Sequence, residues 1–448
     1  MPEARQLAQV TLIALLALSG VLLSLHSPES TSAAASTLSK TPKTRVEALV
    51  ITVTSANDSG PGSLRQALLD ANANGAGADT INITVNGTIN LAGVLPDIAS
   101  NLMINGPGAN LLTVRRNTGG DYRIFQINSG VSVDLSGLTI SNGSVPTSEG
   151  GGIRNSGVLT ITNCAITGNL ANGGGGIINL GALAVIRSTI SNNTVNADGA
   201  GLFNEGGADL VNSTISGNTA NGFTAGIINI NFGGPTHTLV LVNCTVTANK
   251  GVTEGGIATV DQGGAAQTIL RNTIVANNSA PNLAKSGTNT SVLSQGNNLV
   301  SDNGGGFLTQ PSDKPNTDPQ LLPLGNYGGA TQTHALLATS PAVDAGTSVG
   351  APDIDQRGLA RGVNGKGSGA GGNDIGAYEL RSKFVNSATG NDGNNGATLA
   401  SPFKTIARGI AVAVAGDDLV IAAALVLKTI WSSAKVSTCR APARPRRR

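Results

Sequence analysis

The chain has 448 residues, of which 12% are charged and 2% aromatic, while 61 are glycine. Its net charge of +2 depends on the C-terminal tail: residues 422–448 hold seven basic residues and no acid, and the rest of the chain, with 21 basic and 26 acidic residues, has a net charge of −5. This balance argues against a nucleic-acid partner, because a basic surface would have to rest on the tail alone.

One apolar stretch stands near the N-terminus. It runs from Leu7 to Leu25, follows Arg5 and precedes a run of small residues. This order is typical of a signal peptide, which we predict over residues 1–35, followed by a linker over residues 36–48. A retained membrane anchor is the alternative, because the apolar run is long for a signal peptide. Cleavage would release an exported chain without a membrane span.

A short helix is expected within "SGPGSLRQALLDANANG". Ser63 precedes Gln66 by three residues, the spacing of a capping box. The apolar residues of this stretch share one helical face: Leu64, Ala67, Leu68 and Ala71. Strands resume directly afterwards, so we predict that the helix covers the first coil of a β-solenoid, where a strand edge and an apolar interior would otherwise be exposed.

A sequence motif then repeats about every 25 residues, which indicates a solenoid. Its apolar residues alternate with a period of two, as in strands. The central aliphatic residues of the copies form one column: Ile140, Ile166, Ile190, Ile215, Val246 and Ile274. An asparagine suited to a turn follows three residues later in most copies: Asn169, Asn193, Asn218, Asn249 and Asn277. The pattern predicts an all-β chain, with a right-handed parallel β-helix over residues 49–305, an aliphatic ladder inside and an asparagine ladder at one turn.

Two regions resemble known families. The segment "ITVTSANDSGPGSLRQALLDANANGAGADTINI", with Ser-Leu-Arg-Gln-Ala at 63–67, resembles the start of bacterial exported β-helix proteins related to polymorphic outer-membrane proteins. Leu324–Leu380 contains "LGNYGGATQTHALLATSPAVDAG", "DIDQRGLARG" and "NDIGAYEL", and resembles the choice-of-anchor Q module that follows such β-helices. The resemblance implies a small β-rich C-terminal module at residues 306–380 and display at the cell surface. It says almost nothing about activity.

The module motif contains several polar residues that could act together: Asp344, Asp355, Arg357, Asp374 and Glu379. One interpretation is a metal or catalytic cluster. We favour the other, in which these residues cap turns and form a buried ion pair between arginine and carboxylate. The three histidines are too scattered for a zinc site. We therefore expect no cofactor, and a structural Ca²⁺ ion is the one alternative that we keep.

A polysaccharide-cleaving enzyme, either a lyase or a glycoside hydrolase, is the alternative function. Such β-helices need carboxylates on neighbouring coils. Here Glu149 and Asp198 occupy equivalent positions two coils apart, with Gly173 on the coil between them, and few aromatic rings are present to stack on sugars. We expect no catalytic residue and a secreted or cell-surface protein with an adhesin-like or structural role. Its ligand would be an unidentified glycan or protein of the cell envelope or the extracellular space.

The hydroxyl rows of the repeats raise a further hypothesis. A column of threonines could form a flat face that binds glycans or ice: Thr189, Thr214, Thr245 and Thr273. The simpler explanation is that β-branched residues favour strands. Cys164 and Cys244 share another column three coils apart, roughly 14 Å by the spacing of strands. Since a disulfide requires Cα atoms within about 7 Å, we predict two free, buried thiols.

The last part of the chain resembles the N-terminal start of the β-helix. Residues 384–421 predict the start of another β-helix, with a helix after Ser401 whose apolar face contains Phe403, Ile406 and Ile410. Residues 422–448 have no repeat, and one shifted reading of their codons allows a strand-like sequence. We therefore predict an aberrant, frameshifted and disordered tail that truncates a second β-helix, and a true basic tail is the alternative.

Overall fold

The computed structural model describes residues 47–427, apart from residues 76, 280, 370, 415, 423 and 424. The predicted signal peptide, nearly all of the linker and nearly all of the basic tail lie outside the described residues. The described part belongs to one compact unit, Val46–Arg448. None of its helices is long and apolar enough to cross a membrane.

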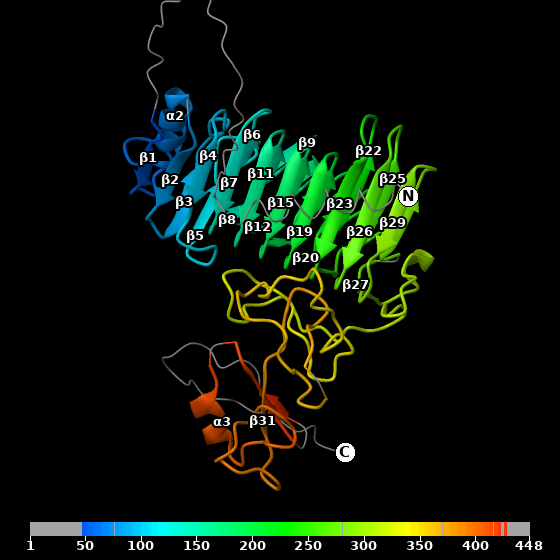
Figure 1. Ribbon diagram of the computed structural model, residues 1–448. Helices are drawn as coiled ribbons and strands as arrows, with labels where there is room; N and C mark the ends of the chain where they lie inside the picture. Colours follow the sequence, from blue (N-terminus) through cyan, green and yellow to red (C-terminus); the bar gives the residue numbers. More distant parts are fainter. Residues whose placement is uncertain are drawn as a thin grey trace, which may run out of the picture. The chain divides into compact units, whose positions relative to one another are not determined.

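A strand–helix–strand unit starts the described chain. β1 (Val50–Val53) pairs in parallel with β2 (Asp79–Ile83), and α2 (Leu64–Asn74) connects them (Figure 1). Ser63 caps α2 by accepting a hydrogen bond from the backbone N–H of Gln66 at 3.2 Å. Only half of the predicted capping box forms, because the Gln66 side chain donates further along the helix. The predicted apolar face is buried: Leu64, Ala67, Leu68 and Ala71.

The chain then forms a parallel β-solenoid, as the repeats predict, and Figure 1 shows its strands stacked in succession. Sheet A has ten strands. They are β1, β2, β4 (Leu102–Asn105), β7 (Ser132–Ser136), β11 (Val158–Thr162), β15 (Ala182–Ile186), β19 (Gly207–Val211), β23 (His237–Val242), β26 (Ala266–Arg271) and β29 (Thr290–Ser294). Sheet B has nine. They are β3 (Gly87–Leu91), β5 (Leu112–Arg116), β8 (Thr139–Ser141), β12 (Ala165–Thr167), β16 (Thr189–Ser191), β20 (Thr214–Ser216), β24 (Thr245–Thr247), β27 (Ile274–Ala276) and β30 (Leu299–Val300).

Two smaller sheets complete the coils. Sheet C has seven strands. They are β6 (Phe125–Ile127), β10 (Ile153–Asn155), β14 (Ile177–Asn179), β18 (Leu202–Asn204), β22 (Ile227–Asn231), β25 (Ile257–Asp261) and β28 (Leu283–Ser286). Sheet D has four: β9 (Ser144–Glu149), β13 (Leu170–Gly173), β17 (Thr194–Val195) and β21 (Thr219–Ala220). Side chains from successive coils meet inside and form one continuous apolar core.

The aliphatic column keeps the predicted register up to its last member. Ile166 pairs with Ile140 and with Ile190, and the column continues through Ile215 to Val246. Val246 then pairs with Val275, so Ile274 is displaced by one residue and pairs with Thr245. Because successive strand residues face opposite sides, this one-residue shift places Ile274 on the outer face of sheet B.

The asparagine ladder shows the same shift. Each buried Nδ2 donates to the Oδ1 of the next member at 2.8–2.9 Å, through Asn169, Asn193, Asn218, Asn249 and Asn278. Asn277, which the repeat pattern selected, lies beside the ladder with a φ of 57°. Its neighbour Asn278 takes the ladder position, because the coil that contains Ile274 is one residue out of phase with the pattern.

A segment without regular strands follows the solenoid. After η1 (Gly304–Gly306), the described part of residues 307–381 forms turns held by isolated bridges, including Leu321 to Leu336 and Ile354 to Ala360. We call these residues the covering segment. Its buried apolar residues pack with Ile274 and Leu299 of sheet B in a cluster of their own. The predicted module therefore packs against the solenoid through a shared apolar core.

The regular β-structure near the C-terminal end lies after the covering segment. β31 (Ser382–Val385) pairs in parallel with β32 (Asp418–Ile421), which pairs antiparallel with β33 (Leu425–Leu427). α3 (Ile406–Val412) connects β31 and β32, so the strand–helix–strand order of the N-terminal unit recurs. The helix begins later than Ser401 suggests: its cap is Thr405, whose hydroxyl accepts from the N–H of Arg408 at 3.1 Å.

The packing of α3 differs from the predicted face. Phe403 is fully buried, but Ile406 and Ile410 are 41% and 38% exposed. Gly409 is the buried residue of the helix, and its backbone approaches Leu419 and Val385 so closely that a Cβ there would lie 2.6 Å and 3.0 Å from their side chains. The small residue at this point turns the helix, so that its isoleucines face outward.

Candidate functional site

The outer face of sheet B carries two rows of small polar side chains. In the first row, Thr139, Ala165, Thr189, Thr214 and Thr245 pair in register from coil to coil. The second row lies two residues further along each strand: Ser141, Thr167, Ser191, Ser216 and Thr247. The strand period of two places both rows opposite the aliphatic ladder. This is the face that the sequence suggested as a ligand surface.

The covering segment occupies half of that face. Thr189, Thr214 and Thr245 are at most 2% exposed. The Thr189 hydroxyl donates to the Gln332 carbonyl, and the backbone N–H of Ala377 donates to the Thr245 hydroxyl at 3.1 Å. The predicted threonine face is therefore not an open binding surface along these coils.

Thr273 also departs from the threonine column. Its hydroxyl oxygen accepts a 3.4 Å hydrogen bond from the backbone N–H of Cys244. It therefore belongs to the buried turn column of the two cysteines, again because this coil is shifted by one residue. Cys164 and Cys244 are themselves free and buried, as predicted.

Gln356 makes the central polar contacts between the covering segment and the half of the outer face of sheet B that the segment covers. Its Nε2 lies 3.0 Å from the Thr189 hydroxyl and 2.9 Å from both the Thr331 hydroxyl and the Gln332 carbonyl. Its Oε1 accepts from the Thr214 hydroxyl at 2.6 Å. The side chain is 1% exposed, so one amide joins the hydroxyl row to the covering segment.

A second set of contacts lies at the turn between sheets A and B. Asparagines in the left-handed conformation, with φ of 48–55°, stack there. Each donates its side-chain amide to a backbone carbonyl of the covering segment: Asn212 to Ile354, Asn243 to Asp374, Asn272 to Thr347 and Asn297 to Ala345. We call these four residues the corner asparagines. Sequence reasoning missed this role, although an asparagine just after the second strand of several copies was a visible signal.

The motif residues Asp355 and Arg357 form a buried ion pair. Arg357 Nε lies 2.8 Å from Asp355 Oδ2, and both side chains are fully buried. The other Asp355 oxygen accepts from the backbone N–H groups of Arg357 and Leu359. The guanidinium also lies 3.7 Å from the ring centroid of Tyr378 and donates to the Gly416 carbonyl at 3.0 Å. This pair fixes the covering segment and reaches the C-terminal strands.

The carboxylates of Asp374 and Glu379 are also occupied. Glu379 accepts from the backbone N–H groups of Gly362, Val363 and Asp374, and pairs with Arg361 at 3.2 Å. Burial raises the pKa of Asp374 well above its ordinary value, and the charge of Glu379 adds to the increase. Burial also raises the pKa of Glu379, against the opposing effect of Arg361.

The fifth motif residue, Asp344, caps a turn. Its carboxylate accepts from the backbone N–H groups of Gly365 at 3.0 Å and Lys366 at 2.9 Å. All five motif residues therefore bond within the protein, as turn caps and arginine–carboxylate pairs. Among residues 47–427, leaving aside the six gaps, no group of histidine, cysteine, aspartate and glutamate is arranged to hold a metal ion.

The acids of the repeats stand apart from this network. Asp198 accepts from the backbone N–H groups of Phe223 and Thr224, and Glu149 pairs in register with Gly173. Burial raises the pKa of Glu205, and the negative charge of Glu149 contributes to the increase. Glu149 and Glu205 thus interact electrostatically, which the coil alignment did not predict.

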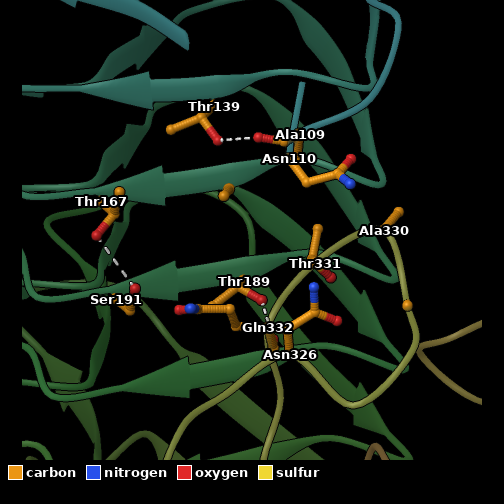
Figure 2. Close-up of a pocket in the computed structure, with 12 residues that line it drawn as sticks. Ala109, Asn110, Thr139, Thr167, Thr189, Ser191, Asn326, Ala330, Thr331 and Gln332 are labelled. Atoms are coloured by element: carbon orange, nitrogen blue, oxygen red, sulfur yellow. Dashed lines mark hydrogen bonds between the residues drawn. The ribbon is translucent and has the colours of Figure 1, made fainter. Parts of the chain in front are cut away.

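A pocket of about 270 Å³ lies where the covered half of sheet B ends (Figure 2). Its floor comes from β8, β12 and β16, and one wall comes from residues 326–332 of the covering segment. All of the lining side chains are uncharged.

Comparison with protein families, with curated proteins and with solved structures finds no match to this chain. The contacts on the outer face of sheet B are therefore the basis for assigning its function.

Proposed function

We propose that this chain is an exported cell-surface β-helix protein with an adhesin-like or structural role, in which the covering segment braces the solenoid. The observation that carries this proposal is that the charged motif residues of the covering segment bond within the protein and hold the segment on the solenoid. Asp355 and Glu379 saturate their oxygens with arginine and backbone N–H groups. A carboxylate engaged in this way is a poor acid, base or metal ligand, and a good structural fixture.

Export and surface display are supported by sequence. The apolar run Leu7–Leu25 with its small-residue flank is suited to a signal peptide. The resemblances to polymorphic outer-membrane-type repeats and to the choice-of-anchor Q module favour a place at the cell envelope. A solenoid suits this role, because its stacked coils present long, regular faces.

Expression of the full chain in a Gram-negative host tests the proposal. We expect cleavage after Ala35, shown by N-terminal sequencing, and digestion of the protein by protease added to intact cells. A variant with Leu15→Arg, which interrupts the apolar run, should stay uncleaved inside the cell. An uncleaved wild-type protein confined to the cytoplasm would overturn the proposal.

A polysaccharide-cleaving enzyme is the second candidate, favoured by the electrostatic coupling of Glu205 with Glu149. A carboxyl group whose pKa is raised by burial and by the charge of a second carboxyl group is the arrangement that general acid catalysis uses. The test is release of reducing ends, or of unsaturated uronates, from a panel of neutral and acidic polysaccharides. Turnover by the wild type that Glu205→Gln abolishes would establish the enzyme and displace the non-catalytic proposal.

A further inference from the structure

The covering segment leaves the first coils of sheet B open. Along the first row, Thr88 on β3 is exposed, Thr113 on β5 and Thr139 on β8 are half-buried, and Thr189 is buried. The outer face is therefore divided into an open part over β3, β5, β8 and β12 and a covered part from β16 onward. The pocket lies at the boundary, where the open rows meet the wall formed by residues 326–332.

One alanine creates the depth of this pocket. Ala165 pairs with Thr139 on one side and Thr189 on the other, so the floor lacks one hydroxyl and one methyl group that the neighbouring coils carry. Ala109, Gly329 and Ala330 are also small and line the same space. At about 270 Å³, the pocket lies just below the usual range for small-molecule sites, about 300–1,000 Å³, and is suited to a single ring.

The polar groups around the pocket have capacity for hydrogen bonds. The side-chain amides of Asn110 and Gln332 and the Nδ2 of Asn326 make no hydrogen bond with the described part of the chain. Thr167 Oγ1 accepts from Ser191 Oγ at 3.2 Å, which leaves its own proton free to donate. Thr139 Oγ1 donates to the Ala109 carbonyl, which leaves its lone pairs free to accept. Figure 2 shows these side chains around the space.

These features select the class of ligand. Amides and hydroxyls supply both donors and acceptors, as sugar hydroxyls require, and the alanine and glycine surfaces suit the apolar C–H face of a ring. The lining side chains carry no charge, so burying a carboxylate or a phosphate there would lack compensation. The open rows allow the rest of a chain to leave the pocket across β12, β8 and β5.

We propose that this pocket binds the terminal residue of a neutral oligosaccharide, with the following sugars lying on the open part of sheet B. This inference rests on the proposed non-catalytic surface role, for which it names the ligand class. It does not require that the protein cleave the glycan, since the hydroxyl and amide groups of the pocket only hold the ring.

The test is binding of defined tetrasaccharides of glucose, galactose, mannose and N-acetylglucosamine to the full chain, by titration calorimetry and saturation-transfer NMR. Tetragalacturonate serves as the acidic comparison. We expect at least one neutral tetrasaccharide to bind, and Ala165→Thr, which restores the residue of the neighbouring coils, to weaken it about tenfold or more. Asn326→Ala should weaken it by a smaller factor through loss of one donor.

Ala184→Thr is the matched control. Ala184 is also a half-buried alanine within a strand, and it pairs with Thr160 on the neighbouring coil, but it belongs to sheet A. This variant should bind like the wild type, and equal melting temperatures of the two variants would show that the coils are intact. Binding to tetragalacturonate alone, binding to no neutral tetrasaccharide, or unchanged affinity of Ala165→Thr would each overturn the inference. If surface protease accessibility persists in any of these cases, the proposed function stands and the pocket assignment alone fails.

Discussion

The attachment of the covering segment depends on a few fully buried polar side chains. Gln356 satisfies hydroxyl groups on two coils at once, and Arg361 donates both to Glu379 and, at 2.7 Å, to the Asn212 side chain. Such groups stabilise a fold modestly when paired and destabilise it strongly when one partner is lost. Single substitutions at these positions should therefore have large effects.

Gln356→Ala should lower the free energy of unfolding by about 2–4 kcal/mol, because it removes the buried amide that bonds at once to Thr189, Thr214, Thr331 and Gln332 and leaves a cavity in its place. Chemical denaturation followed by circular dichroism measures the change. The matched control is Gln262→Ala on an exposed turn, which should change stability by less than about 0.5 kcal/mol. Equal effects of the two substitutions would contradict the role assigned to Gln356.

His334 gives the contact with sheet B a pH dependence. Its Nδ1 donates to the Leu322 carbonyl and its Nε2 accepts from the Ser216 hydroxyl at 2.8 Å. Burial lowers its pKa from the ordinary 6.5, against the opposing effect of the Leu322 carbonyl. The unfolded chain thus binds a proton more readily than the folded one. The stability from neutral His334 is complete above about pH 6.5 and decreases as the pH falls from there toward the folded-state pKa.

Urea midpoints at a series of pH values between about 4.5 and 7.5 test this linkage. Replacement by glutamine, His334→Gln, should flatten the decrease below pH 6.5. His237→Gln removes the other described histidine and should keep the decrease of the wild type. A wild-type slope in His334→Gln would show that other groups cause the pH dependence.

The two buried thiols should be inert in the native state. Burial raises the pKa of both Cys164 and Cys244 to about 12 from the ordinary 9.0, which lowers the thiolate fraction near neutral pH by about a thousandfold. In a Cys439→Ser background, which removes the third cysteine of the sequence, we expect a thiol reagent to label neither residue until the chain unfolds in denaturant. Rapid labelling of the native protein, or a mass that reveals a 164–244 bridge, would contradict this expectation.

At the scale of secondary-structure elements, the sequence specifies the strands of the coils better than it specifies the structure of the covering segment. Alternating aliphatic residues and turn asparagines predicted the strands, because an inward residue has to match its neighbours on adjacent coils. The pattern failed at "NTIVANN", where Ile274 and Val275 are both aliphatic and Asn277 and Asn278 both suit a turn. Only the pairing of Val246 with Val275 resolves the register.

The two neighbouring asparagines can be separated by mutation. Asn278→Ala removes a ladder member that bonds to Asn249 and to the Val246 carbonyl, and should cost about 2–3 kcal/mol. Asn277→Gly keeps the left-handed backbone favourable and removes only a side chain outside the ladder, so it should cost less than about 1 kcal/mol. Thermal denaturation of both variants decides the register, and the reverse order of stability would favour the position chosen from the repeat.

At the scale of the whole molecule, the open and covered halves of sheet B could not be told apart from sequence. A β-branched threonine suits an exposed strand and a strand covered by polar contacts equally well. Thr139 and Thr214 are equivalent in the repeat, yet one borders the pocket and the other is fully buried. The cover comes from residues far along the chain with no strand pattern of their own, so neither the attachment nor the pocket was predictable.

Hydrogen exchange should reveal the extent of the covering segment. Arg361→Met leaves the buried carboxylate of Glu379 without its arginine and removes the contact with Asn212, a loss of about 3–5 kcal/mol. We expect faster exchange across residues 354–380 and at the turns of the corner asparagines. Exchange in β2, β4 and β7 should stay at the wild-type rate. Uniform acceleration along the whole solenoid would contradict a local attachment.

The corner asparagines give the molecule uneven resistance to pulling. A stack of coils normally resists tension only through contacts between neighbours, and it yields coil by coil from either end. Asn212, Asn243, Asn272 and Asn297 tie four successive turns to one continuous stretch of backbone. Force applied along the axis should therefore extend the coils before β19 first, in small steps, and leave the coils tied by these asparagines to rupture later as one block.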